Sequence, residues 1–78
     1  MNKREEIRRL ISEVTEKKVT TADDESLFES GVLDSFALPD LVTAIESAFQ
    51  VTIPDSDLTP RKFDSIERID GYLTAKGV

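Results

Sequence analysis

The apolar residues of the chain recur at the spacing of a helix face in three separate stretches. The first stretch predicts an amphipathic helix near residues 3–17, because its apolar residues follow the i, i+3, i+4, i+7 pattern. These residues are Ile7, Leu10, Ile11 and Val14. The second stretch predicts a helix that begins near Asp34 or Ser35 and runs to about Gln50. Its inward stripe consists of Leu38, Leu41, Val42, Ile45, Ala48 and Phe49.

The third stretch lies near the C-terminal end of the chain. We expect Asp64 to cap this helix and Glu67, three residues later, to complete a capping box. Its inward residues are Ile66, Ile69, Tyr72 and Leu73. A short helical turn is expected around residues 56–62, where Asp55 or Ser56 can serve as the cap. No run of β-branched residues is long enough to predict a strand.

Residues 19–33 form a long connection between the first two predicted helices. The connection is polar in its first half and apolar in its second half, so buried side chains are expected to hold the second half in place. A structured loop of this length is uncommon in a compact domain and is usually functional. We therefore predict an all-α fold in one domain, residues 1–78: a small bundle of three main helices plus one short helix.

The composition excludes several classes of function. The chain of 78 residues contains no cysteine and no histidine, so serine–histidine and cysteine–histidine catalysis and the usual zinc sites are ruled out. We predict no catalytic residue and no metal site, since so short a chain is unlikely to enclose a substrate pocket. No apolar run is long enough to span a membrane. The N-terminus lacks an apolar signal core, and we expect a cytoplasmic monomer.

Charge is distributed unevenly along the chain, whose net charge is -6. Residues 1–18 and 61–78 contain all ten lysines and arginines, and Lys17 and Lys18 suit the C-terminal end of the first helix. Residues 19–60 contain no basic residue and nine acidic ones. Such a surface repels nucleic acid and attracts basic partners, although acidity can also serve only to keep a small domain in solution.

The densest local signal is the string from Leu27 to Phe36, which includes Gly31, Asp34 and Ser35. An Asp-Ser pair at the start of a helix is most often a simple cap when it is taken alone. In this string, however, the pair places the Ser35 hydroxyl where an ordered loop ends and a helix begins, inside the acidic region. Ser35 is therefore the candidate site residue.

The string and the residues around it resemble the acyl carrier protein family. The resemblance covers nearly the whole chain, and the form Gly-Val-Leu-Asp-Ser-Phe is closer to discrete carriers, such as D-alanyl carrier proteins, than to peptidyl carrier domains. The matching pieces are Leu27-Phe28, Gly31, Asp34-Ser35-Phe36, Leu41-Val42, Ala44-Ile45-Glu46, Phe49, Ile53-Pro54, Ile66 and Tyr72.

The resemblance implies that Ser35 carries a covalent 4'-phosphopantetheine arm, which a phosphopantetheinyl transferase installs from coenzyme A. The thiol of the arm would hold acyl or aminoacyl groups as thioesters, loaded by a ligase and passed to downstream acyl-processing enzymes of fatty acid or secondary metabolite biosynthesis. The chain would then be a non-catalytic phosphoprotein. A helix N-terminus suits such an anion, because it offers unpaired N–H groups and a partial positive charge.

Recognition by basic partner enzymes is expected to involve Asp34, Phe36, Asp40 and Glu46. The acidic residues could instead form only a solvated helix face, and Phe36 is either an exposed contact or part of the core. The competing hypothesis for the whole chain is a carrier-like acidic helical adaptor that never receives the arm.

Pro39 leaves the start of the second helix open, because its missing N–H would have bonded to the Ser35 carbonyl. Either Asp34 is the cap and one helical bond is lost, or Ser35–Leu38 form an irregular turn and the regular helix begins at Pro39.

Overall fold

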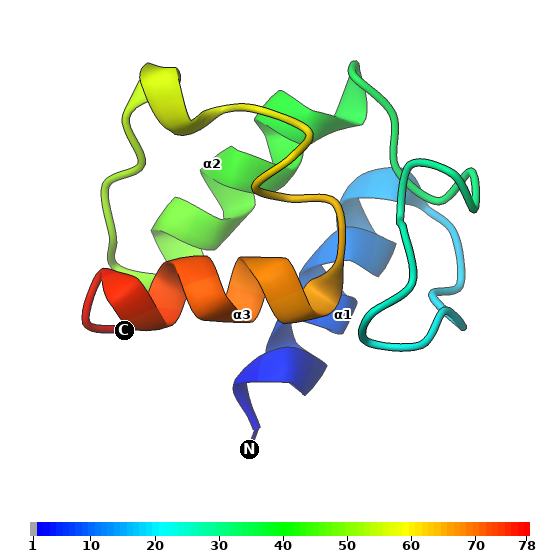
Figure 1. Cartoon of the computed structure of the whole chain (residues 1–78), viewed down its shortest axis with the longest axis horizontal. Helices are drawn as coiled ribbons and strands as arrows, with labels where there is room; N and C mark the ends of the chain where they lie inside the picture. The colour runs from blue at the N-terminus through cyan, green and yellow to red at the C-terminus, as the bar shows by residue number, and fades with distance from the viewer. Residues whose placement is uncertain (1) are drawn as a thin grey trace.

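The computed structural model describes residues 2–78, which form three α-helices joined by two long connections (Figure 1). The helices are α1 (Lys3–Thr15), α2 (Ala37–Phe49) and α3 (Ile66–Ala75), and a short 3-10 helix, η1 (Asp55–Asp57), lies between α2 and α3. No strand occurs within the described residues. The all-α fold, with three main helices, one short helix and a long loop after the first, is confirmed. The short helix is shorter than the turn expected over residues 56–62, and the expected cap by Asp55 or Ser56 is wrong, because η1 begins at Asp55 without a side-chain cap.

The central helix is α1, which packs against both α2 and α3. Within the described residues the backbones of α2 and α3 do not come close to each other, although both helices contribute side chains to the one core. The core is formed by Ile7, Leu10, Ile11, Leu27, Leu33, Leu38, Leu41, Val42, Ile45, Ile53, Phe63, Ile66, Ile69 and Leu73. Every helix thus buries the face that the periodicity predicted, but Ala48 is exposed, because a single methyl group gains little from burial.

The connection after α1 is fixed to the segment before α3. Leu27, which is fully buried, donates its N–H to the Asp64 carbonyl over 2.6 Å, and the Ser26 hydroxyl donates to the Asp64 carboxylate over 2.7 Å. Gly31 turns the chain with φ of +82°, a conformation that other residues resist. In Figure 1 this connection folds back on itself along one edge of the molecule before it enters α2. A structured loop was expected here, and its anchors are residues far away in the sequence.

The predicted cap of α3 is wrong by one residue. The Ser65 side chain, not that of Asp64, accepts the Arg68 N–H over 3.1 Å, and Ser65 is buried. The Asp64 carboxylate is turned toward Ser26 in the loop, and the N–H of Glu67 bonds to the Asp23 carbonyl over 2.9 Å. The capping box therefore does not form, because tertiary contacts with the loop use the groups that it would need.

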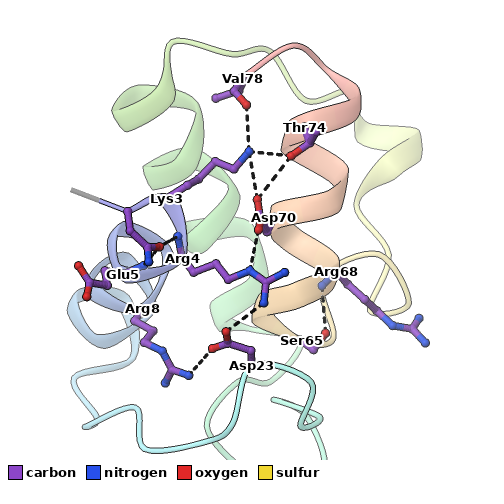
Figure 2. A network of polar contacts seen from close by, with 11 residues as sticks. Lys3, Arg4, Glu5, Arg8, Asp23, Ser65, Arg68, Asp70, Thr74 and Val78 are labelled. Atoms are coloured by element: carbon purple, nitrogen blue, oxygen red, sulfur yellow. Dashed lines mark hydrogen bonds and ion pairs between the residues drawn. The ribbon is translucent and has the colours of Figure 1, made fainter.

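Ion pairs join the N-terminal half of α1 to α3 and to the loop (Figure 2). Asp70 of α3 accepts from Lys3 Nζ at 3.0 Å and from Arg4 Nε at 2.6 Å. Asp23 of the loop accepts from Arg4 Nη1 at 3.0 Å and from Arg8 Nη2 at 2.6 Å. Arg4 thus joins both carboxylates. These hydrogen bonds hold the pKa of Asp23 and of Asp70 below their usual range.

The start of α2 is organised by Asp34. One oxygen of its carboxylate accepts the N–H groups of Phe36 and Ala37, both over 2.9 Å, and its carbonyl accepts the N–H of Leu38 over 3.1 Å. Phe36 already has helical dihedral angles, φ of -78° and ψ of -34°. Asp34 is therefore the functional cap, and the alternative in which the regular helix begins at Pro39 is wrong. Pro39 removes only the N–H that would have reached the Ser35 carbonyl.

Replacement of the Asp34 cap tests this geometry. We expect Asp34→Ala to lower the free energy of unfolding by about 1 kcal/mol, because two N–H groups lose their acceptor. Asp34→Asn should lower it much less, since the amide oxygen can still accept both bonds. Urea unfolding of the three proteins measures the difference. Equal losses in the two variants would contradict the assignment of the cap.

Removal of the Asp70 carboxylate tests the ion pairs. Because the folded-state pKa of Asp70 is lowered, its charge stabilises the fold fully above the unfolded pKa of about 3.9, and this contribution is lost as the pH falls through the lower folded value. We expect Asp70→Asn to lower the urea midpoint at neutral pH and to approach the parent protein in strong acid. Asp24→Asn, at an exposed loop position, is the control. A difference that persists unchanged in acid would contradict the role of the charge.

Candidate functional site

Ser35 lies in the turn immediately before α2 and is exposed, as are its neighbours Asp34 and Phe36. Within residues 2–78 the Ser35 hydroxyl makes no hydrogen bond to another residue, whereas the two nearest serines are engaged: Ser26 donates to Asp64, and Ser30 donates to the Leu27 carbonyl over 3.0 Å. The structure thus leaves the Ser35 hydroxyl accessible from solvent at the junction between loop and helix.

The N–H groups at the start of α2 are not unpaired and free to bind an anion, contrary to the expectation from the sequence. The Asp34 carboxylate already accepts two of them, from Phe36 and Ala37. The carboxylate also places a negative charge at the positive end of the helix dipole. A phosphodiester on Ser35 would therefore remain hydrated on the solvent side of the turn instead of replacing water with these N–H groups.

The outer face of α2 carries an apolar residue among polar ones. Phe36, Asp40, Thr43 and Ser47 follow the i, i+4, i+7, i+11 spacing of one helix face, and all four are exposed. Phe36 is 92% exposed and is the only large apolar side chain of the described residues that is this accessible. The sequence left two alternatives for Phe36. A place in the core is wrong, and an exposed position agrees with the structure.

The four residues expected in partner recognition are not equally available. Asp40 is exposed, and Asp34 is exposed although its carboxylate caps α2. Glu46 is only half-buried, and its carboxylate accepts the Ile53 N–H over 2.8 Å, which fastens the segment after α2. This carboxylate therefore has a structural contact that the sequence did not indicate, and its role in recognition stays a prediction.

Lys17 is a residue near the site that the sequence placed differently. It was assigned to the C-terminal end of the first helix, but α1 ends at Thr15 and Glu16 adopts a left-handed conformation with φ of 56°. The Lys17 ammonium group donates to the Gly31 carbonyl over 2.7 Å and so fastens the loop just before Ser35. No local pattern predicts this contact, because it depends on how the loop folds back.

A hollow of about 260 Å³ adjoins the start of α2. It is lined by the end of α1, by Lys17 and Val32, and by the beginning of α2, namely Asp34, Phe36, Ala37 and Asp40. The hollow therefore lies between the end of α1 and the start of α2, and Ser35 is not among the residues that line it.

The acidic region is partly neutralised within the fold. Asp23 pairs with two arginines of α1, and Asp57 pairs with Lys62 over 3.0 Å and accepts the Tyr72 hydroxyl over 2.6 Å. These bonds hold the pKa of Asp57 below its usual range. Burial and the Asp57 carboxylate raise the pKa of Tyr72 to about 12. Fewer carboxylates thus remain without a cationic partner than the sequence suggested. Asp34 and Asp40, beside Ser35, are among those that remain.

Two further searches concern only the residues that the structure describes. Residues 2–78 hold no group of three or more metal-ligating side chains. In the same range no helix is both long and apolar enough to cross a bilayer.

Comparison with known proteins gives one family. The family model described as "Phosphopantetheine attachment site" matches residues 5–69 of this chain. A D-alanyl carrier protein of Streptococcus suis (strain 05ZYH33) is 33% identical over 69 residues, which cover 88% of this chain and 87% of that protein. Another, from Bacillus velezensis, is 32% identical over 75 residues, 95% of this chain and 96% of that protein. A third, from Streptococcus mutans serotype c, is 30% identical over 74 residues, 95% and 94% of the two chains.

These matches extend over nearly the whole chain and include the loop, the turn that presents Ser35 and the outer face of α2. They agree with the exposed hydroxyl at the start of α2 and indicate covalently attached 4'-phosphopantetheine as the cofactor. The chain therefore belongs to the phosphopantetheine-attachment family of carrier proteins and is of the type to which D-alanyl carrier proteins belong.

Proposed function

We propose that the chain is a single carrier domain, residues 1–78, which holds 4'-phosphopantetheine on Ser35 and delivers thioester-bound groups to partner enzymes. The observation that carries the proposal is the exposure of the Ser35 hydroxyl in the turn immediately before α2, without a hydrogen bond inside the described chain. Ser26 and Ser30 lie nearby, but their hydroxyls are bonded to the loop and its anchor. Ser47 and Ser56 are exposed as well, but only Ser35 lies between Asp34 and Phe36 in the string that resembles the attachment motif.

Attachment to Ser35 requires a second enzyme. Ser35 Oγ would form a bond to the β-phosphorus of coenzyme A, the bond to adenosine 3',5'-bisphosphate would break, and a phosphopantetheinyl transferase would take the proton of the hydroxyl. The described residues near Ser35 offer no histidine as a base and no metal cluster, so the transferase supplies both. The arm, when bound, supplies the thiol that this cysteine-free chain lacks.

The cargo is best sought among aminoacyl groups. The three relatives reported above are named as carriers of D-alanyl groups, which favours a D-alanyl or similar aminoacyl thioester, loaded by a ligase, over a long acyl chain. Because the phosphodiester would stay hydrated beside Asp34, the tether would move freely and could reach successive partners. A cytoplasmic location and a monomeric state remain predictions from the sequence.

Partner enzymes would recognise the start and the outer face of α2. Phe36 offers an exposed apolar anchor, and Asp34 and Asp40 flank it with negative charge. A complementary partner has an apolar pocket surrounded by lysine or arginine. Glu46, the fourth residue proposed for recognition, would act at the far end of this face, where its contact with Ile53 limits its reach.

Intact mass measures the modification directly. The protein is incubated with coenzyme A and a broad-specificity phosphopantetheinyl transferase. We expect a gain equal to one phosphopantetheinyl group, and none in Ser35→Ala, because the acceptor oxygen is missing. Ser30→Ala is the matched control and should gain the same mass as the parent. No gain on folded parent protein would refute the carrier function and favour the unmodified adaptor, which binds basic partners without an arm.

Substitution on the outer face of α2 tests recognition. We expect Phe36→Ser to slow modification about tenfold at limiting transferase, because truncation of an interface anchor commonly costs more than about 1 kcal/mol. Asp40→Asn should weaken the salt dependence of the rate. Asp24→Asn is the control of equal charge and should behave as the parent. Unchanged rates in both α2 variants would contradict the proposed surface, even if Ser35 is modified.

A further inference from the structure

The two flanks of α3 carry opposite charges. One flank presents Asp70, which pairs with Lys3 and Arg4 of α1 (Figure 2). The other flank presents Arg68, Tyr72 and Lys76 at the i, i+4, i+8 spacing of one helix face. Figure 2 shows the Arg68 side chain extending away from the ion pairs of the first flank. Only the first flank therefore finds its counter-charge on a neighbouring helix.

The segment before α3 adds two more cations to the second flank. Arg68 Nη1 donates to the Arg61 carbonyl over 2.9 Å, which brings Arg61 next to the start of α3. Lys62 Nζ lies 5.9 Å from the centre of the Tyr72 ring, and Lys76 Nζ lies 5.5 Å from it. A hollow of about 350 Å³, lined by Arg61, Lys62, Arg68 and Tyr72, opens at this place. We call it the basic hollow.

The positive charge of the basic hollow is mostly uncompensated. Lys62 pairs with Asp57, but Arg61 and Arg68, like Lys76 nearby, have no carboxylate within ion-pair distance among residues 2–78. All other pairs of the described chain join α1 to carboxylates of its own face, of the loop or of α3. Arg61 and Arg68 thus line the basic hollow without an ion-pair partner in the described chain, although Arg61 also borders a neighbouring hollow that Glu29 and Asp64 line.

We propose that the basic hollow binds a short acidic segment of a partner protein. The Arg61 and Arg68 guanidinium groups can each hold a carboxylate through two parallel hydrogen bonds. The Tyr72 hydroxyl donates to Asp57, and its ring is flanked by Phe63 and by the ammonium groups of Lys62 and Lys76, so the acidic segment would be held through the two guanidinium groups. An extended polyanion such as a membrane surface fits less well, because the remaining acidic surface would repel it.

This site would give the carrier a second contact, opposite in sign to the one at the start of α2. A partner that presents basic residues to Asp34 and Asp40 and an acidic segment to the basic hollow would match both surfaces, and a partner with one sign only would not. The inference concerns binding to α3 and does not require that Ser35 carries the arm.

Titration of the unmodified full chain, followed by ¹H–¹⁵N correlation spectra, tests the proposal. The probe is a short synthetic peptide of alternating glutamate and leucine, and its glutamine counterpart is the control peptide. We expect shifts concentrated in residues 61–76, weaker at high salt and absent with the control peptide. The double variant R61Q/R68Q should raise the Kd about tenfold, because two exposed charge-assisted contacts are removed.

The matched control is R9Q/K18Q, which removes the same charge from a different face and should change the Kd by less than about twofold. Equal weakening by both double variants would show an effect of net charge alone and overturn the site. So would shifts away from residues 61–76, or shifts produced by inorganic phosphate or vesicles of phosphatidylglycerol but not by the peptide. The spectra of each variant without peptide report whether its fold is intact, and single variants replace a double variant that unfolds.

Discussion

The burial of one face of α1 against both α2 and α3 is the interaction on which the rest of the structure depends. Ile7 and Ile11 are fully buried, and α1 is the helix that contacts both of the others. A chain this short buries only about 60–65% of its unfolded surface, so few residues are available to hold the fold. In the described chain the backbones of α2 and α3 come close to α1 but not to each other.

Polar side chains of α1 also hold the loop in place. Arg4 bonds both Asp70 of α3 and Asp23 of the loop, while Leu27 and Ser26 fasten the loop to Asp64. The long connection is therefore held by buried and ionic contacts at several points, although it contains no regular secondary structure. This explains how a loop can deliver Ser35 to a defined place at the start of α2 instead of leaving it on a mobile segment.

At the start of α2, one residue stabilises the helix and its neighbours face the solvent. The Asp34 carboxylate is turned to the backbone, where it caps the helix, while the side chains of Ser35 and Phe36 remain in solvent. A carrier needs both properties, since an enzyme must find a hydroxyl in a fixed position and yet meet no obstruction. The charges of the molecule follow a similar division, with acidic residues beside Ser35 and uncompensated cations at the far flank of α3.

The buried helix faces and the position of Ser35 could be predicted from local sequence. The buried face of each helix follows from the spacing of residues such as Ile7, Leu41 and Ile69, because an amphipathic helix can bury its apolar residues together only on one face. The position of Ser35 at the start of a helix followed from the same pattern and from the family motif. The Asp64 cap and the free N–H groups at α2 were predicted incorrectly, because one side chain can satisfy several competing donors and only the folded loop decides among them.

The amino-acid order alone thus determined the three helices, their buried faces, the absence of histidine and cysteine chemistry, and the serine at the junction of loop and helix. The tertiary structure decided the polar contacts between segments, whereas the pairs of Arg9 with Glu6 and Glu13 lie within one helix. Lys17 reaches Gly31, Arg4 joins Asp23 to Asp70, and Arg61 comes to lie beside Arg68, although each contact joins separate segments of the chain. The physical reason is that such contacts depend on distances in space, which arise only when the core has brought the segments together.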